Sequence, residues 1–555
     1  MITSAKLEVQ LIVDAFKKTN VSHIVLSPGS RNAPLSIAFD EDPFFTTFLI
    51  PDERSAAFIA LGLAQQLKRP VAIACTSGSA PLNYYPAVVE AFYQKIPLIV
   101  LTADRPAEWT DQGDGQTIRQ QNVFGSHVVD FQQLDTIKSK EDQWFFERKL
   151  AKSFHAASRK KSGPVHLNIP FSEPLYEVSE SSAKINNWIS FLPTKSELAT
   201  ESKKELDTFF ANKKKHLIIV GQHNDDSISS TLLQNIIDSK NTIVLSEHTS
   251  NLSLKNSIDC IDQILNCMIE NQEDSFYPDL IIQLGDAIIS KKIKRFLRKS
   301  NAPVIRVNES FTDMDVFQNL SYSLAIDTNS FLEFYSSHST VSELNFFSKW
   351  NELVLKVNKS HELSFPSVPF CDLKVVNSLM RNLEQATCLH ISNSSMIRYV
   401  LLFENDKNNK IYCNRGTSGI DGSTSTAVGA ALANPDVNHV MLTGDLSFFY
   451  DSNALWNRHF PKNLRIVIVN NGGGDIFNII PGPDSTNQHK SIFVAEQSIS
   501  AELLVKNFGL IYEGVKSIEE FETAFISNQA QVIEVNTMGI ENSSELKRYF
   551  QKMRV

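Results

Sequence analysis

The sequence lacks most features that mark secreted or membrane-spanning proteins. Its 555 residues hold six cysteines, and no two of them form a C-x-x-C pair or show zinc-ligand spacing. Several, such as Cys75 in the run 71–75, lie among apolar residues and are expected to be buried thiols in a reducing compartment. No stretch approaches the roughly 20 apolar residues of a membrane helix, and residues 1–6 lack the apolar core of a signal peptide. We therefore expect a cytoplasmic protein without membrane insertion.

Positive charge is also sparse, because the net charge is −9. A basic run at 213–215 precedes a strand-like apolar segment, where a solvated turn is the simpler interpretation. The chain thus offers no net electrostatic attraction for phosphate backbones, and we expect no nucleic-acid partner. Glycines 472–474 are not followed by Gly-Lys-Ser/Thr, which excludes a Walker A loop there.

Short apolar runs alternate with segments of helical period along the whole chain, which is typical of parallel βα units. At about 150 residues per domain, the length predicts three or four domains. The first block contains expected strands at 23–27, 71–76 and 97–101 and expected helices at 55–67 and 82–93, and it closes near 164–170. The polar segment 173–202 is expected to be a linker.

A second block begins at an expected strand over 216–221 and continues through 242–246, 280–285 and 303–307. Residues 336–341 are expected to join it to a third block, which ends at the strand 531–535. No repeat is visible in the sequence itself. The pattern predicts an α/β protein with parallel sheets.

In the third block, two apolar runs end in polar residues that could share a ligand. The run 439–443 ends at Gly444 and Asp445, and the run 464–469 ends at Asn470 and Asn471. The carboxyl ends of neighbouring parallel strands lie side by side, and such sheets bind ligands there. Asp445, Asn471 and the Gly473 carbonyl could therefore offer three oxygens to Mg²⁺, which completes its shell with water and phosphate oxygens. The alternative is two ordinary strand ends, because Asp, Asn and Gly are common in turns.

Residues 27–35 (SPGSRNAPL) and 52–57 (DERSAA), taken with Asp445 and Asn471, resemble the thiamine-diphosphate enzymes of the decarboxylase and synthase type. More narrowly, the chain resembles the 2-succinyl-5-enolpyruvyl-6-hydroxy-3-cyclohexene-1-carboxylate synthase family of menaquinone biosynthesis. Further matching segments follow the family's order across nearly the whole chain: 76–81 (TSGSAP), 101–106 (LTADRP), 115–120 (GQTIRQ), 414–422 (NRGTSGIDG) and 473–477 (GGDIF). SPGSRNAPL and NRGTSGIDG are specific to these synthases, whereas GD…NN marks only the wider superfamily.

The resemblance implies three doubly wound parallel-sheet domains. These are a pyrimidine-binding domain over residues 1–178, a central domain over 190–338, and a diphosphate- and Mg-binding domain over 345–555. Family members hold the cofactor between the first domain of one subunit and the last domain of another. The resemblance therefore implies self-association, with a homodimer as the minimum and a homotetramer as the larger possibility.

The resemblance also implies a transferase that uses thiamine diphosphate and Mg²⁺, with Mn²⁺ as a possible substitute. 2-Oxoglutarate is decarboxylated on the cofactor, and the resulting succinyl carbanion adds to isochorismate in a conjugate addition. The alternatives are another thiamine-diphosphate 2-oxoacid decarboxylase or carboligase, and a catalytically inactive homologue. An acetohydroxyacid-type synthase would bind FAD, for which the sequence gives no support, and the intact Glu53, Asp445 and Asn471 argue against inactivity.

Glu53 is the first candidate for catalysis. Thiamine chemistry needs a carboxylate against the pyrimidine ring, so that a proton can be relayed through the cofactor. Apolar residues 56–59 follow Glu53, and we expect desolvation to raise its pKa. The alternative is an acid favoured at a helix start by the macrodipole. Ile420 matches the bulky residue that keeps the cofactor bent, although it could also be a core residue.

By resemblance, the remaining cofactor contacts follow the two strand ends. Leu446 replaces the second Gly of the superfamily's GDG, and Gly472 stands where relatives usually carry Asn or Asp, but neither change removes a ligand. An apolar wall at 476–480 is expected to help carboxylate loss by excluding water, and its alternative is a helix core face. The assigned cofactor-binding residues are Glu53, Ile420, Asp445, Ser447, Asn471, Gly473, Ile476 and Phe477.

Substrate specificity is expected to rest on cations, because both substrates carry two carboxylates and Arg grips a planar carboxylate with two bonds. Ser394 and Arg398 have i,i+4 spacing, which places them on one helix face. Lys291 and Lys292 could instead belong to a solvated charge run. Relatives often carry Lys-Arg at 291–292 and Asn at Gly115. By resemblance the substrate residues are Ser30, Arg31, Arg105, Gln116, Lys291, Lys292, Ser394, Arg398, Phe477 and Ile480, with Ser30, Arg31 and Gln116 also assigned to catalysis.

Overall fold

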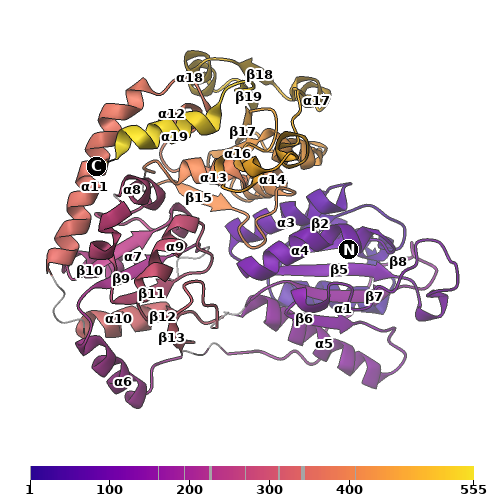
Figure 1. Cartoon of the computed structure of the whole chain (residues 1–555). Helices are drawn as coiled ribbons and strands as arrows, with labels where there is room; N and C mark the ends of the chain where they lie inside the picture. Colours follow the sequence, from indigo (N-terminus) through magenta and orange to yellow (C-terminus); the bar gives the residue numbers. More distant parts are fainter. Residues whose placement is uncertain are drawn as a thin grey trace. The chain divides into compact units, whose positions relative to one another are not determined.

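The computed structural model describes residues 2–159, 162–192, 194, 196–223, 228–268, 270–310, 313–338, 344–406 and 408–554. These residues form three large sheets and one two-stranded sheet, with helices between the strands (Figure 1), which confirms the predicted α/β class. Backbone contacts divide the chain into two compact units. Unit 1 comprises Met1–Pro193, Gly416–His439 and Ser447–Leu464, and unit 2 comprises Thr194–Arg415, Val440–Leu446 and Arg465–Val555.

The first sheet has six strands, and every pair of neighbours is parallel. Their order is β3 (Thr46–Leu49), β2 (His23–Leu26), β4 (Val71–Cys75), β5 (Leu98–Asp104), β7 (Val165–Pro170) and β6 (Asp130–Gln133). β4 and β5 are buried along their whole length, which explains their unbroken apolar sequences. The winding reverses between β2 and β4, and such a switch point is where open α/β sheets bind ligands. The helices of this block are α1 (Leu7–Lys18), α2 (Ala33–Asp40), α3 (Glu53–Leu67), α4 (Ala80–Gln94) and α5 (Lys140–Ser158).

The predicted linker over 173–202 is partly wrong, because much of it is bound to the first block. β8 (Val178–Ser179) pairs antiparallel with β1 (Thr3–Ser4). The Ile185 side chain is buried, and its N–H donates to Asp14 at 2.9 Å. The end of the segment opens α6 (Thr200–Ala211). The prediction rested on the polar composition of this segment. Composition does not reveal the few long-range contacts that bind such a segment to a domain.

The second sheet is parallel throughout, with the order β10 (Thr242–Ser246), β9 (His216–Val220), β11 (Leu280–Leu284), β12 (Val304–Val307) and β13 (Leu320–Leu324). The third has the order β15 (Lys410–Cys413), β14 (Cys388–Ile391), β16 (His439–Gly444), β17 (Leu464–Asn470), β19 (Val532–Asn536) and β18 (Tyr512–Val515). Counted in chain order within each sheet, the first and third share the order 2-1-3-4-6-5. The fold therefore contains a repeat that the sequence does not display.

Unit 2 also contains most of the remaining helices. α11 (Leu344–Ser364) and α19 (Asn542–Met553) pack together (Figure 1). The other helices of this unit include α8 (Ile261–Cys267), α9 (Lys291–Ser300), α12 (Asp372–Asn382), α13 (Ser395–Val400) and α16 (Ile476–Ile479). The joint predicted at 336–341 is described only as far as His338, the end of α10 (Thr328–His338), and 339–341 lie outside the described residues. Because the two units do not follow chain order, the boundaries at 178, 190, 338 and 345 stay a prediction.

Two further expectations concern the whole chain. All six cysteines are buried and free, as the apolar surroundings of Cys75 predicted. Among the described residues, no helix combines the length and apolar character needed to cross a bilayer.

α3 packs closely on α14 (Ser423–Ala433), and glycines make this possible. A β-carbon on Gly429 would lie 1.9 Å from the Ile59 carbonyl oxygen, and one on Gly62 would lie 2.0 Å from that of Thr426. A β-carbon on Gly422, just before α14, would lie 2.2 Å from the Phe58 ring. The two helix backbones therefore approach each other at positions where any side chain would force them apart.

We expect Gly429→Ala to lower the thermal unfolding midpoint by several degrees, because overpacking typically costs about 1–3 kcal/mol and here the obstacle is a backbone atom. Differential scanning calorimetry would measure this. Gly115→Ala is the matched control, since a β-carbon there meets nothing within 4 Å. Equal midpoints for the two variants would show that the helices separate at no cost.

Candidate functional site

At the switch point of the first sheet, the residues that follow the carboxyl ends of β2 and β4 contact each other and the segment around Gln116. The Ser27 N–H donates to the Ala74 carbonyl at 2.9 Å, and a β-carbon on Gly29 would lie 2.3 Å from the Thr76 side chain. The Ser77 hydroxyl donates to the Gln116 carbonyl at 2.8 Å. The matching segments 27–35, 76–81 and 115–120 therefore meet at one sheet edge.

Two guanidinium groups lie near each other at this edge. Arg31 is 4% exposed, and it donates to the Phe171 carbonyl at 2.8 Å and lies 3.2 Å from the Glu173 carboxylate. Arg105 donates to the Gly115 carbonyl at 3.1 Å. Burial and then the charge of Arg105 lower the pKa of Arg31, which places the two cations within electrostatic range. An anion between them would gain from both charges.

Ser30 and Gln116 complete the predicted set at this edge. Both are exposed, and the Ser30 carbonyl accepts the Ala33 N–H at the start of α2. Asp114 lies 3.4 Å from the Arg105 guanidinium, so both arginines have acidic partners that the sequence analysis did not identify. A carboxylate substrate would have to compete with these two acids.

Glu53 is the first residue of α3. The preceding Asp52 caps the helix by accepting the N–H groups of Arg54 at 2.8 Å and Ser55 at 3.2 Å. Glu53 is half-buried, and burial raises its pKa, in the expected direction. Its charge in turn contributes to the raised pKa of Cys75 and of Tyr84, so the carboxylate lies near the end of β4 and near α4.

The segment that carries Ile420 is fixed by a buried carboxylate on α4. Glu90 is 1% exposed, and it accepts the N–H groups of Gly416 and Thr417, each at 2.7 Å, and the Thr417 hydroxyl at 2.6 Å. The Ser447 hydroxyl donates to the Ile420 carbonyl at 3.0 Å. Ser447 and Ile420 are therefore linked to each other, and Ile420 is half-buried.

In unit 2, Asp445 and Asn471 are each oriented by neighbours. Asp445 is buried, and it accepts the Gln497 amide and the Gly473 N–H. Asn471 donates through Nδ2 to the Asp372 carboxylate at 2.7 Å. Its Oδ1 is buried, and among the described residues it has no hydrogen-bond partner. A buried acceptor in this state costs free energy unless it is satisfied, as a bound cation would do.

Gly473 adopts a backbone conformation that other residues rarely reach, with φ of +147°, and a β-carbon there would lie 2.6 Å from the Val494 carbonyl oxygen. Burial followed by the charge of Asp475 raises the pKa of Asp372 to about 7, and burial raises that of Asp445. In the part of the chain that is described, no three His, Cys, Asp or Glu side chains are grouped to hold a metal. Asp445 is the only residue of these four types among the three predicted ligands. The Asp445 carboxylate, the Asn471 amide oxygen and the Gly473 carbonyl oxygen suit a hard cation such as Mg²⁺.

The predicted apolar wall, residues 476–480, comes directly after this segment in the sequence. Ile476 is 8% exposed in the single turn α16, whereas Phe477 and Ile480 are half-buried. The Phe477 ring lies 5.8 Å from that of Phe493, centroid to centroid. Phe477 and Ile480 thus retain exposed apolar surface, which a helix core face would not.

Ser394 and Arg398 meet at the start of α13, as their spacing predicted. Ser394 is the N-cap, and the Arg398 guanidinium donates to its carbonyl. Burial and then the charge of Arg415 lower the pKa of Arg398. Arg415 itself donates to Asn393 at 2.8 Å. Arg415 follows the end of β15, so the rule that selected Asp445 and Asn471 after their strands could have found it.

The structure separates the predicted pair Lys291 and Lys292. The pKa of Lys294 is lowered by burial and is influenced next by Glu247 and Arg415, with Lys291 also within range. Lys292 instead lines a pocket with residues of α8. Lys291 and Lys294 therefore lie on the side of α9 nearer to Arg415, and Lys292 lies on another side.

Comparisons with known proteins agree with this arrangement. Residues 9–126 match the N-terminal TPP binding domain of thiamine pyrophosphate enzymes, and residues 391–535 match the C-terminal TPP binding domain. A solved benzoylformate decarboxylase from Polynucleobacter necessarius has a TM-score of 0.71 at 18% identity, with 96% of this chain and 98% of that chain covered. That likeness shows that the two chains share a fold.

Curated relatives cover almost the whole chain. A 2-succinyl-5-enolpyruvyl-6-hydroxy-3-cyclohexene-1-carboxylate synthase from Flavobacterium johnsoniae is 42% identical over 98% of both chains. Proteins of the same name from Flavobacterium psychrophilum and Porphyromonas gingivalis are 39% and 35% identical, and they cover 98% and 99% of this chain and 98% and 97% of their own. At this identity over this length, the chain belongs to the 2-succinyl-5-enolpyruvyl-6-hydroxy-3-cyclohexene-1-carboxylate synthase family of thiamine-diphosphate enzymes.

Proposed function

We propose that the chain catalyses the synthase reaction of menaquinone biosynthesis, in which 2-oxoglutarate loses carbon dioxide and its remaining four-carbon unit adds to isochorismate. The observation that carries this proposal is the full-length relationship to synthases of that name, at up to 42% identity among those compared. Neither alternative considered from the sequence, a different 2-oxoacid enzyme or an inactive homologue, receives support from these relatives.

We assign the substrate carboxylates to two groups of cations. Arg31 and Arg105, with Ser30 and Gln116, form the group at the edge of the first sheet, where the two guanidinium groups lie within electrostatic range. Arg398 and Ser394, with Lys291, form the second group, and the position of Arg415 beside Arg398 supports adding it. Holding the two acids in attack geometry lowers the activation barrier, because the entropy of orienting them is lost on binding and not in the reaction step. Lys292 stays a weaker candidate, because it faces elsewhere.

Glu53 is proposed as the acid–base residue. Its raised pKa brings proton exchange closer to neutral pH, where general acid–base catalysis works best. Bound thiamine diphosphate would supply the electron sink that makes loss of carbon dioxide possible. Ile420, Ile476 and Phe477 would contact the cofactor, and Phe477 and Ile480 would exclude water from the reacting groups.

We propose that Asp445, Asn471 and the Gly473 carbonyl hold Mg²⁺, or Mn²⁺ in its place, together with the cofactor diphosphate, with Ser447 nearby. The orphaned Oδ1 of Asn471 supports this assignment most directly. We also propose that copies of the chain associate and share active sites, as the family resemblance implies. The six free, buried cysteines are consistent with a cytoplasmic location.

Purified protein with thiamine diphosphate, Mg²⁺, 2-oxoglutarate and isochorismate should yield the succinyl-cyclohexene adduct and carbon dioxide by mass spectrometry. Glu53→Gln should lower turnover by about 10²–10⁴-fold, because the side chain keeps its shape and loses the transferable proton. Unchanged circular dichroism would show that this variant folds. Succinic semialdehyde without adduct would refute isochorismate as acceptor, and full activity of Glu53→Gln would refute its role.

Asp445→Ala should weaken thiamine diphosphate binding at limiting Mg²⁺ by at least about tenfold, because one charged metal ligand is lost. Calorimetric titration of the cofactor at several Mg²⁺ concentrations would measure this without turnover. Asp436→Ala, an exposed acid in the loop before β16, is the matched control and should bind as the unsubstituted chain does. Equal affinities in all three proteins would exclude Asp445 from the metal site.

Glu53→Gln and Asp445→Ala should each have little activity alone at limiting Mg²⁺ and cofactor. Mixed after subunit exchange, they should regain up to about a quarter of full activity if each site uses Glu53 of one copy and Asp445 of another. Half of a random mixture pairs unlike subunits, and each such pair rebuilds one of its two sites. Steady-state rates of the mixture, with light scattering to establish the assembly, would test this. A mixture as inactive as its components would place both residues of each site in one chain.

A further inference from the structure

α9 carries six cations and no carboxylate, and these cations fall on two faces. Lys291, Lys294 and Arg298 are spaced i, i+3 and i+7, and so are Lys292, Arg295 and Lys299 one residue later. The first face lies near Glu247 and Arg415, as the surroundings of Lys294 indicate. Like charges at such spacings destabilise a helix. Helix stability therefore does not account for the second basic face.

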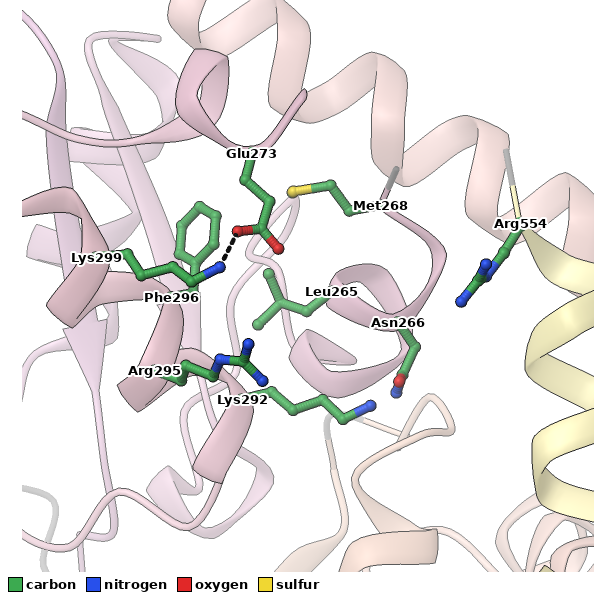
Figure 2. A pocket seen from close by; sticks show the side chains of 9 residues that line it. All are labelled: Leu265, Asn266, Met268, Glu273, Lys292, Arg295, Phe296, Lys299 and Arg554. Carbon is green, nitrogen blue, oxygen red and sulfur yellow. Dashed lines mark hydrogen bonds and ion pairs between the residues drawn. The ribbon is translucent and has the colours of Figure 1, made fainter. Parts of the chain in front are cut away.

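The second face lines a pocket of about 490 Å³. Figure 2 shows Lys292, Arg295 and Lys299 extending from α9 along one side, with Arg554 approaching from the other. Glu273 is the one acid in the described lining, and it pairs with Lys299 at 2.7 Å. Four cations and one carboxylate leave a surplus of three positive charges in a concave site, where their fields add.

The rest of the lining indicates what kind of anion fits. Leu265, Met268 and Phe296 supply an apolar wall, and the last two are buried. Arg295 and Arg554 present planar forks that match carboxylates, whereas the lysines act as point charges. The volume lies in the range of pockets that hold small molecules. A carbon frame with several carboxylates would satisfy both kinds of lining.

One acid lies within electrostatic range of both this pocket and the substrate cations. Asp262 accepts the Ser290 hydroxyl just before α9. Burial raises the pKa of Asp262, and the positive charges of Lys292 and Arg398 both oppose that rise, so its carboxylate lies within range of each. Neither Arg398 nor Arg415 lines the pocket. The negative charge of Asp262 thus offsets part of the positive charge of each group.

We propose that this pocket is a second acid-binding site, which takes a small organic anion bearing two or more carboxylates on a carbon frame, independently of the substrate residues around Arg398. The site needs no turnover to be tested, so its failure and a failure of the proposed reaction can be told apart. The probe is benzene-1,3,5-tricarboxylate, whose ring suits the wall of Phe296 and whose three charges match the surplus.

Calorimetric titration of the full chain loaded with thiamine diphosphate and Mg²⁺ should show one probe site per chain, weakened by added salt. Arg295→Gln and Arg554→Gln, on two different elements, should each weaken binding about tenfold or more, since each removes a charge-assisted bidentate contact. Lys356→Gln, an exposed cation on α11, should leave it unchanged. Because two separate variants are used, misfolding of one still leaves a test.

Saturating 2-oxoglutarate should not displace the probe, and inorganic phosphate at equal concentration should bind more weakly. Displacement by 2-oxoglutarate would overturn the proposal by making the pocket part of the substrate site. Equal binding by the unsubstituted chain, Arg295→Gln and Arg554→Gln would overturn it by placing the probe elsewhere. Absence of heat and of any melting shift with the probe would overturn it outright.

Discussion

The backbone contact between α3 and α14 is the constraint on which unit 1 depends. Gly62 and Gly429 let the two helices approach until a β-carbon on either would lie about 2 Å from a carbonyl oxygen of the other helix. Contacts between backbones leave no flexible side chain to absorb a shift. The first turn of α3, which carries Glu53, is therefore fixed relative to the residues that precede α14. The acid–base role proposed for Glu53 would benefit from such rigidity, because a displacement of about 1 Å can remove much of the benefit of orientation.

Buried carboxylates extend this constraint through hydrogen bonds. Glu90 holds the N–H groups of Gly416 and Thr417, and Asp451 accepts the N–H and the hydroxyl of Ser425, each at 2.7 Å, just inside α14. The half-buried Asp52 accepts the Asn453 amide while it caps α3. Buried acids are costly unless hydrogen-bonded, and their bonds are directional. They therefore set the conformation of the segment around Ile420 more narrowly than apolar packing would.

The sequence predicted the parts of the structure that depend on local pattern. Apolar runs such as 71–76 and 280–285 became β4 and β11, and Asp445 and Asn471 directly follow the ends of β16 and β17 as expected. Hydrogen-bond partners that lie far apart in the sequence could not be predicted from it. Glu90 lies 326 residues from Gly416, and Asp372 lies 99 residues from Asn471, so no local spacing could connect either pair. The linker over 173–202 failed for the same reason, since its anchors Asp14 and Glu147 lie far upstream.

The net charge of −9 does not describe the local charge around the candidate site residues, where acidic and basic side chains form separate groups. Near Asn471, burial and then the charges of Asp475 and Asp445 raise the pKa of Asp372, and a cation nearby would oppose that rise. Around Arg398 the opposite holds, because burial and then the charge of Arg415 lower its pKa, and an anion would oppose both effects. Each group is incomplete in a way that the other's ligand could not satisfy, since one calls for a cation and the other for carboxylates. On the proposed assignment, the metal ion and the two dicarboxylic acids would be directed to different groups by the sign of their charge before shape contributes.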